Sequence, residues 1–327
     1  MKEFSPEGVR QIYENICAEL SRVIVGQEQI VRLLLISMFA RGHCLLIGVP
    51  GLAKTLLVKS LAESLQLSFK RIQFTPDLMP GDIIGSELLQ EKERRLEFEY
   101  QAGPIFANLL LADEINRTPP KTQSALLEAM QEGNVTVGQE TRGLPEPFVV
   151  IATQNPIEQE GTYPLPEAQL DRFMFSLTLD YPAKLEEVEI VRRTTMQEPI
   201  TLAPVATREE ILAVQRFVLI APVSDHVIHY AVDLASATRP NTDGAPAITR
   251  ELVEWGAGPR ASQYLILGAK ALALLKGKLT PETSDVREVA RAVLEHRVIT
   301  NYHATGSGKK ALDVVESLLG TVKEKTY

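Results

Sequence analysis

The stretch Gly48-Val49-Pro50-Gly51-Leu52-Ala53-Lys54-Thr55 decides the fold of this chain. It follows a short apolar run and leads into a helical pattern, so we expect a strand, a loop and the start of a helix. A loop of this kind turns backbone N–H groups toward phosphate oxygens, while its Lys reaches the β- and γ-phosphates and its Thr binds Mg²⁺. All eight residues are candidates for holding a nucleotide, and a strand, turn and helix without a ligand is the alternative.

Ala53 departs from the general form of this loop, which has glycine at that position. A methyl group is tolerated there if the backbone already has helical dihedral angles. The departure weakens the match to the pattern and leaves the mechanism in place.

Five short apolar runs alternate with helical patterns between about residues 41 and 181. This rhythm predicts a parallel sheet with helices on both faces. The expected strands are His43–Ile47, Phe69–Gln73, Leu109–Ala112, Phe148–Thr153 and Phe173–Leu179.

The third run ends in two adjacent carboxylates, Asp113 and Glu114. In proteins with a phosphate-binding loop, such an Asp helps to hold Mg²⁺ and a neighbouring carboxylate can act as general base toward water. Thr55 and Asp113 are therefore the candidate metal ligands. The alternative is a carboxylate pair that complements a helix dipole.

The fourth run continues into Gln154, Asn155 and Pro156. Polar side chains at the carboxyl end of a strand lie where open α/β sheets bind ligands. Asn155 could orient water or the γ-phosphate, or it could be a turn residue, because Asn-Pro favours turns.

The composition limits the possible partners. The net charge of −8 and the pI of about 5.4 argue against phosphate backbones or anionic membranes as partners. The two cysteines, Cys17 and Cys44, suggest a reducing cytoplasm rather than a disulfide framework. No apolar run reaches the length of a membrane span, so we expect no membrane anchor.

The organisation of the chain predicts two domains, residues 1–200 and 201–327. The first begins with an amphipathic helix over Met1–Leu20 that Ser5 can cap, and it contains a β-hairpin at about residues 85–103. Leu96, Phe98 and Tyr100 alternate with acidic residues in that hairpin. The second domain is expected to be all-helical, and the hairpin either contacts a substrate or packs on its own domain.

Three strings give the chain a family resemblance: Ile24-Val25-Gly26-Gln27, Asp113-Glu114-Ile115-Asn116-Arg117 and Ala152-Thr153-Gln154-Asn155-Pro156. With these, the sequence resembles the MoxR family of AAA+ ATPases from about residue 5 to 300. Further similar stretches are Arg71–Asp77, Lys121–Glu128 and Tyr163–Phe173.

The resemblance implies an α/β fold, a P-loop AAA+ parallel sheet of order 5-1-4-3-2 with helices on both faces, followed by an all-helical lid. It implies ATP and Mg²⁺ as ligands, with Lys54 on the phosphates and Val25 and Gly26 beside the adenine. Asn155 corresponds to the sensor-1 residue and Arg260 to the sensor-2 residue. Arg172 corresponds to an arginine finger offered to a neighbour's nucleotide.

The resemblance also implies an ATPase that acts as a homo-oligomeric ring, a hexamer in the family pattern, in chaperone-like remodelling, maturation or activation of protein complexes. A separately encoded von Willebrand A domain protein is the implied partner. Two other classes stay open: an AAA+ motor on nucleic acid, which the acidic charge disfavours, and a nucleotide-gated scaffold without turnover. A scaffold of that kind would be expected to lack equivalents of Glu114, Asn155 or Arg172.

Overall fold

A five-stranded parallel sheet forms the centre of the computed structural model, which describes residues 5–92, 95–157, 161–196 and 200–324. The strand order is β2-β5-β8-β1-β9, which confirms the expected order 5-1-4-3-2. Each strand lies within one residue of its expected bounds at either end, except that β9 begins at Phe175, two residues after the expected start. The strands are β1 (Cys44–Ile47), β2 (Phe69–Gln73), β5 (Leu109–Asp113), β8 (Val149–Gln154) and β9 (Phe175–Thr178).

The strands β1, β5 and β8 are largely apolar because both faces of the sheet are buried there, whereas the edge strand β2 exposes Lys70, Arg71 and Gln73. Side chains alternate between the faces, so Leu109 and Leu111 of β5 lie in one core, whereas Leu110 and Ala112 lie in the other. The first core includes helices α1 (Pro6–Leu20), α2 (Glu28–Phe39) and α3 (Lys54–Ser64). The second includes α4 (Pro80–Ile84) and α5 (Pro120–Glu132).

The N-terminal helix begins at Pro6, and residues 1–4 of the expected helix lie outside the described ranges. The Ser5 hydroxyl accepts a hydrogen bond from the Gly8 N–H, as expected for an N-cap. Val9, Ile16 and Leu20 are buried on the core side of the helix.

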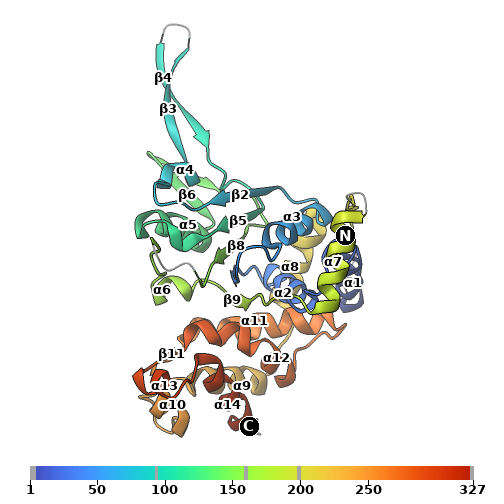
Figure 1. Ribbon diagram of the computed structural model, residues 1–327, viewed down its shortest axis with the longest axis vertical. Coiled ribbons are helices and arrows are strands. Elements are labelled where there is room, and N and C mark those ends of the chain that lie inside the picture. Colours follow the sequence, from blue (N-terminus) through green and yellow to red (C-terminus); the bar gives the residue numbers. More distant parts are fainter. Residues whose placement is uncertain (1–4, 93–94, 158–160, 197–199, 325–327) are drawn as a thin grey trace.

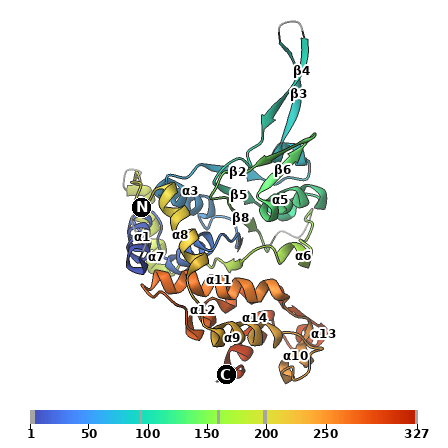
Figure 2. The same cartoon turned by 180° about the vertical axis from the view of Figure 1, so that it is seen from behind.

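The predicted hairpin consists of β3 (Gly85–Lys92) and β4 (Arg95–Ala102), which project from the sheet (Figures 1 and 2). Its tip, residues 93–94, and the side chain of Leu96 lie outside the described part of the structure. A second hairpin, β6 (Asn134–Val137) and β7 (Glu140–Gly143), was not anticipated. It packs at the base of the first, where the Arg142 guanidinium lies 4.0 Å from the Tyr100 ring centroid.

The C-terminal part is mainly helical, as predicted from the sequence, and includes one short antiparallel strand pair. The expected helical region is confirmed. Strands β10 (Val253–Trp255) and β11 (Ile299–Thr300) are a small addition that was not predicted, because they are too short to give a periodic signal. The remaining elements are α6 (Glu167–Leu170), α7 (Lys184–Met196), α8 (Arg208–Ile220), α9 (Asp225–Ser236), α10 (Ala247–Leu252), α11 (Pro259–Leu275), α12 (Thr283–Leu294), α13 (Tyr302–Gly306), α14 (Ala311–Thr321) and the 3-10 turns η1 (Ile115–Arg117) and η2 (Glu295–Arg297).

Within the described ranges, no single helix has both the length and the apolarity to cross a membrane. One bent helix pair, α8 with α9, passes that test only when the two are taken together across a 91° bend.

Candidate functional site

Three of the predicted motifs lie at one edge of the sheet, where the parallel strands end. The phosphate loop follows β1, Asp113 closes β5, and Asn155 follows β8. Hydrogen bonds join these three segments: Gly48 N–H donates to Gln154 O at 3.1 Å, and Glu114 N–H donates to the Thr153 hydroxyl at 2.8 Å. We call this the nucleotide edge.

The loop itself offers free backbone donors. Among the described residues, the N–H groups of Gly51, Leu52 and Ala53 have no hydrogen-bond partner within the protein. They precede the N-terminus of α3, whose dipole favours an anion. The Lys54 ammonium donates to Gly48 O across the loop. Partial burial lowers the pKa of Lys54 from its usual range, and the nearby carboxylates of Asp113 and Glu114 oppose that shift.

Ala53 does not have the helical dihedral angles that would tolerate a methyl group without strain. Its φ of 55° and ψ of 25° are left-handed, and it caps α3 without a side-chain hydrogen bond. This conformation costs an L-residue about 1–2 kcal/mol relative to the right-handed helix, which explains why glycine is general there. The prediction that helical dihedral angles would make a methyl group tolerable at Ala53 is therefore wrong. The loop keeps its shape at a cost in backbone strain.

Asp113 has both carboxylate oxygens engaged. Oδ2 accepts hydrogen bonds from Arg71 Nη2 at 2.6 Å and Arg71 Nε at 3.0 Å, and Oδ1 accepts one from the Thr153 hydroxyl at 2.5 Å. Mg²⁺ prefers oxygen ligands, and it would compete with the Arg71 guanidinium for the Asp113 carboxylate. The donor set of Asp113 and the Thr55 hydroxyl at the start of α3 therefore fits Mg²⁺.

Glu114 is held in a left-handed conformation with φ 57° and ψ 50°. Its Oε2 accepts hydrogen bonds from Gln73 Nε2 at 2.8 Å and from Arg117 Nη1 at 2.9 Å. Strained backbone at a charged residue is typical of functional sites, where surrounding contacts fix an unfavourable conformation. The two donors keep the carboxylate in one place beside Asp113.

Both predicted roles of Asn155, as a turn residue and as a polar contact for a ligand, are compatible with its position in the structure. Its Oδ1 accepts a hydrogen bond from Ile157 N–H at 3.2 Å, which is the local turn expected of Asn-Pro. The residue is buried, and its amide nitrogen donates no hydrogen bond within the described residues. That amide is therefore free to donate to a ligand at the nucleotide edge.

The segment assigned to the adenine lies against the same loop. Gln27 Nε2 donates to Leu52 O at 3.3 Å, which joins Val25 and Gly26 to the phosphate loop. Gly26 has φ 71°, and a Cβ there would lie 2.4 Å from the Glu186 carboxyl of α7. The left-handed φ of this position favours glycine, whereas the Glu186 carboxyl is the end of a flexible side chain that could move aside.

The two predicted arginines lie at the opposite edge of the sheet. Arg172 precedes β9, and Arg260 is in the first turn of α11. Both line a cavity of about 150 Å³ together with His43, which precedes β1. Because β1 and β9 are parallel, residues before them lie about 16 Å from the phosphate loop, farther than an arginine side chain reaches. We call this the arginine edge.

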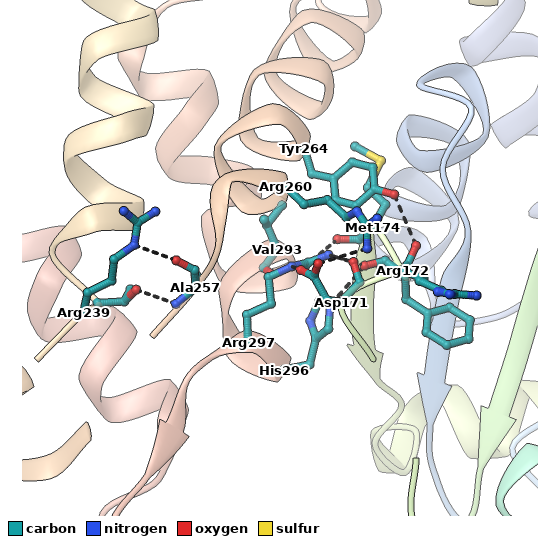
Figure 3. Close-up of polar contacts among 12 residues, drawn as sticks. Asp171, Arg172, Met174, Arg239, Ala257, Arg260, Tyr264, Val293, His296 and Arg297 are labelled. Atoms are coloured by element: carbon teal, nitrogen blue, oxygen red, sulfur yellow. Dashed lines mark hydrogen bonds and ion pairs between the residues drawn. The ribbon is translucent and has the colours of Figure 1, made fainter. Parts of the chain in front are cut away.

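Figure 3 shows how the arginine edge is built. The Asp171 carboxylate pairs with Arg260 Nη1 at 3.0 Å and with Arg297 Nε at 2.8 Å, and Tyr264 Oη donates to Arg172 O at 3.2 Å. The Arg172 guanidinium has no ion-pair partner among the residues that the structure describes. The backbone of Arg172 is thus fixed, while its guanidinium forms no ion pair with the described residues.

Several residues of these two edges were not identified from the sequence. Arg71 and Gln73 lie on the same face of β2, which pairs with β5, and Thr153 lies in the string quoted for Asn155, so strand pairing could have placed them. Arg297 carries no local signal, because its partner Asp171 lies 126 residues earlier.

Comparisons with known proteins match a region in each half of the chain to a known family. The family described as "ATPase family associated with various cellular activities (AAA)" matches residues 43–175, and the AAA lid domain matches residues 245–318. Similar proteins include Chaperone MoxR1 of Mycobacterium tuberculosis, 44% identical over 94% of this chain and 81% of that protein.

Two further similarities extend over nearly the same length. Protein MoxR of Methylorubrum extorquens is 32% identical over 86% of this chain and 85% of its own. A crystal structure of a proposed ATPase from Cytophaga hutchinsonii superposes with a TM-score of 0.91 at 40% identity, covering 98% of this chain and 97% of that one.

Proposed function

Because this chain belongs to the MoxR family of AAA+ ATPases, we propose that it hydrolyses Mg²⁺-ATP at sites shared between neighbouring copies of itself. One observation carries the proposal: the phosphate-binding and arginine sets lie on opposite edges of one sheet. A single chain cannot bring both to one nucleotide. A head-to-tail ring, hexameric by the family resemblance, brings the arginine edge of one subunit to the nucleotide edge of the next.

In this proposal each residue has one task. The N–H groups of the loop and Lys54 bind the phosphates, Glu114 takes the proton of the attacking water, and Asn155 orients that water. Thr55 and Asp113 would hold Mg²⁺, which neutralises phosphate charge when bound. Arg172 and Arg260 of the neighbour stabilise the charge that develops during transfer.

The sharing of sites predicts that the ATPase rate per chain rises with protein concentration, because only assembled chains contain complete sites. Phosphate release would be measured over a dilution series, with the mass of the assembly measured by light scattering in the same samples. A rate per chain that stays constant while the mass falls from ring to monomer would contradict the shared site.

We further propose that hydrolysis drives chaperone-like remodelling of a protein client, by moving a helical domain, residues 201–327, against residues 1–200. The name of the relative Chaperone MoxR1 supports this class of activity. A von Willebrand A domain protein is the partner that we propose on the family resemblance, and the cytoplasm is the proposed compartment.

The β3–β4 hairpin is the surface that we assign to the client. Leu89 and Phe98 lie directly opposite each other on one face of the hairpin, and Phe98 is 72% exposed. Tyr100, nearer the base, donates its hydroxyl to Ile84 O and is partly buried. The base is therefore anchored, and an apolar cross-strand pair is presented beyond it.

Changing Leu89 and Phe98 to Ser is expected to leave ATP binding and basal hydrolysis intact and to abolish client binding, because the pair lies away from the nucleotide edge. Pull-down of a von Willebrand A protein encoded beside the gene would be compared with the ATPase rate. Leu88→Ser, on the opposite face of the same hairpin, is the matched control. Loss of soluble protein would instead show that the pair belongs to a core.

A further inference from the structure

The segment that carries the arginine finger is held from two sides. Its N–H groups bond within the sheet domain: Arg172 N–H donates to Gln169 O at 3.2 Å, and Met174 N–H donates to His43 O at 2.8 Å. Its carbonyl groups bond to residues that come much later in the chain. The finger therefore lies at a junction between the sheet and the C-terminal helices.

One side chain, Arg297 of η2, supplies most of the bonds to those carbonyls. Its guanidinium donates to the carbonyl oxygens of Asp171 at 2.8 Å, Phe173 at 2.5 Å and Met174 at 3.3 Å. The one remaining carbonyl, Arg172 O, accepts from Tyr264 Oη. Every carbonyl of the segment 171–174 is thus bound by α11 or η2, as Figure 3 shows in part.

The same guanidinium also fixes the second arginine. Arg297 Nε bonds to Asp171 Oδ1, and Asp171 Oδ2 pairs with Arg260, so one carboxylate links the two cations. Arg297 lies 5.2 Å from the Tyr264 ring centroid, which places the charge over an aromatic face. Moving Arg297 would therefore disturb Arg172 through its backbone and Arg260 through Asp171.

Burial makes this arrangement specific for arginine. Arg297 is only 5% exposed, and a buried cation is tolerated only when its donors are satisfied. Its planar fork reaches several carbonyls at once, whereas lysine presents one nitrogen with three donors. A lysine at this position would keep the charge beside Asp171 and lose the multiple backbone contacts.

We propose that Arg297 is the positioning residue of the arginine edge: it ties the segment Asp171–Met174 to α11 and η2, so that Arg172 and Arg260 are presented to the neighbouring subunit as one unit with the C-terminal helices. This inference rests on the proposed shared site. It adds that the position of the finger depends on the helical part of the subunit that donates it.

Arg297→Lys is expected to bind ATP and form rings as the parent chain does and to lower saturated ATPase turnover roughly 10- to 100-fold, because a finger displaced by about 1 Å is poorly aligned. Arg291→Lys is the matched control, since Arg291 is an exposed arginine of α12 that pairs with Glu316. That control is expected to leave turnover unchanged.

Mixed rings separate positioning from a general effect on the fold. The Arg297→Lys subunit keeps an intact nucleotide edge, and a Glu114→Gln subunit keeps an intact arginine edge, so mixing the two impaired proteins should raise turnover above that of either alone. Arg172→Ala mixed with Glu114→Gln is the reference for the same rescue. Recovery in the reference without recovery for Arg297→Lys would overturn the positioning role and leave the shared site standing.

Failure of the reference itself, with mixed rings present by native mass spectrometry, would instead refute the shared site. If Arg297→Lys does not fold, Tyr264→Phe serves in the same experiment, because it removes only the hydroxyl that bonds to Arg172 O. It should lower turnover less than Arg297→Lys and be rescued by Glu114→Gln. A Tyr264→Phe defect that mixing does not rescue counts against the proposal in the same way.

Discussion

Arg172→Ala is expected to bind ATP with the affinity of the parent chain and to hydrolyse it about 10³-fold or more slowly at every protein concentration. The reason is geometric: the guanidinium lies at the arginine edge, has no ion-pair partner among the described residues, and is remote from the phosphate loop of its own chain. Binding would be measured by calorimetry and turnover by phosphate release.

The mixing experiment with Glu114→Gln decides whether Arg172 acts across the subunit boundary. An Arg172→Ala subunit keeps its own general base and would use the arginine of its neighbour, so activity should return in mixed rings. Arg10→Ala is a suitable control, because Arg10 is an exposed residue of α1 that pairs with Glu14 one helical turn away. A turnover equal to that of the parent would remove Arg172 from the site.

Glu114→Gln is expected to bind ATP normally and to lose turnover by roughly 10²- to 10⁴-fold, because the amide keeps the shape of the carboxylate and cannot take a proton. Its oxygen can still accept from Gln73 or Arg117, so the loop should not move. Lys54→Ala, in contrast, is expected to abolish ATP binding, since it removes a phosphate contact.

Calorimetry and phosphate release on the two variants separate binding from chemistry. Parent-like hydrolysis by Glu114→Gln would mean that another group is the base. A parent chain that binds ATP and shows no turnover above that of Glu114→Gln would favour the nucleotide-gated scaffold, the class that keeps binding without hydrolysis.

Most of the sheet could be predicted from the sequence because β1, β5 and β8 are buried on both faces and appear as apolar runs. Leu109–Asp113 was located in this way to within one residue. Phe69–Gln73 was located too, although Lys70, Arg71 and Gln73 are exposed on this edge strand. The hairpin β6–β7 was missed although its signal is present: Val135 and Val137 alternate with polar residues before a turn at Gly138, whose φ is 62°. Each of these strands has only four residues, which is too short for the alternation to stand out from the surrounding loop.

The candidate site was predictable in its parts and not in its assembly. Motifs that directly follow strands, such as Asp113 and Asn155, could be assigned to the nucleotide edge because parallel strands end together. The pairing of Arg260 with Asp171 and the contacts of Arg297 join helices to the sheet over about a hundred residues of sequence. Such contacts depend on how the layers pack, which no local pattern records.

The position of the nucleotide edge and the arginine edge at opposite ends of the strands also has a genetic consequence. In the shared site that we propose, each copy of the chain takes part in two sites, one that contains its own nucleotide and one that contains its neighbour's. In a cell that makes both an intact protein and an Arg172→Ala protein, altered copies would enter rings with intact ones and silence sites whose own residues are all normal. Loss of an ordinary monomeric enzyme from one gene copy is usually masked by the other, whereas this defect would be dominant.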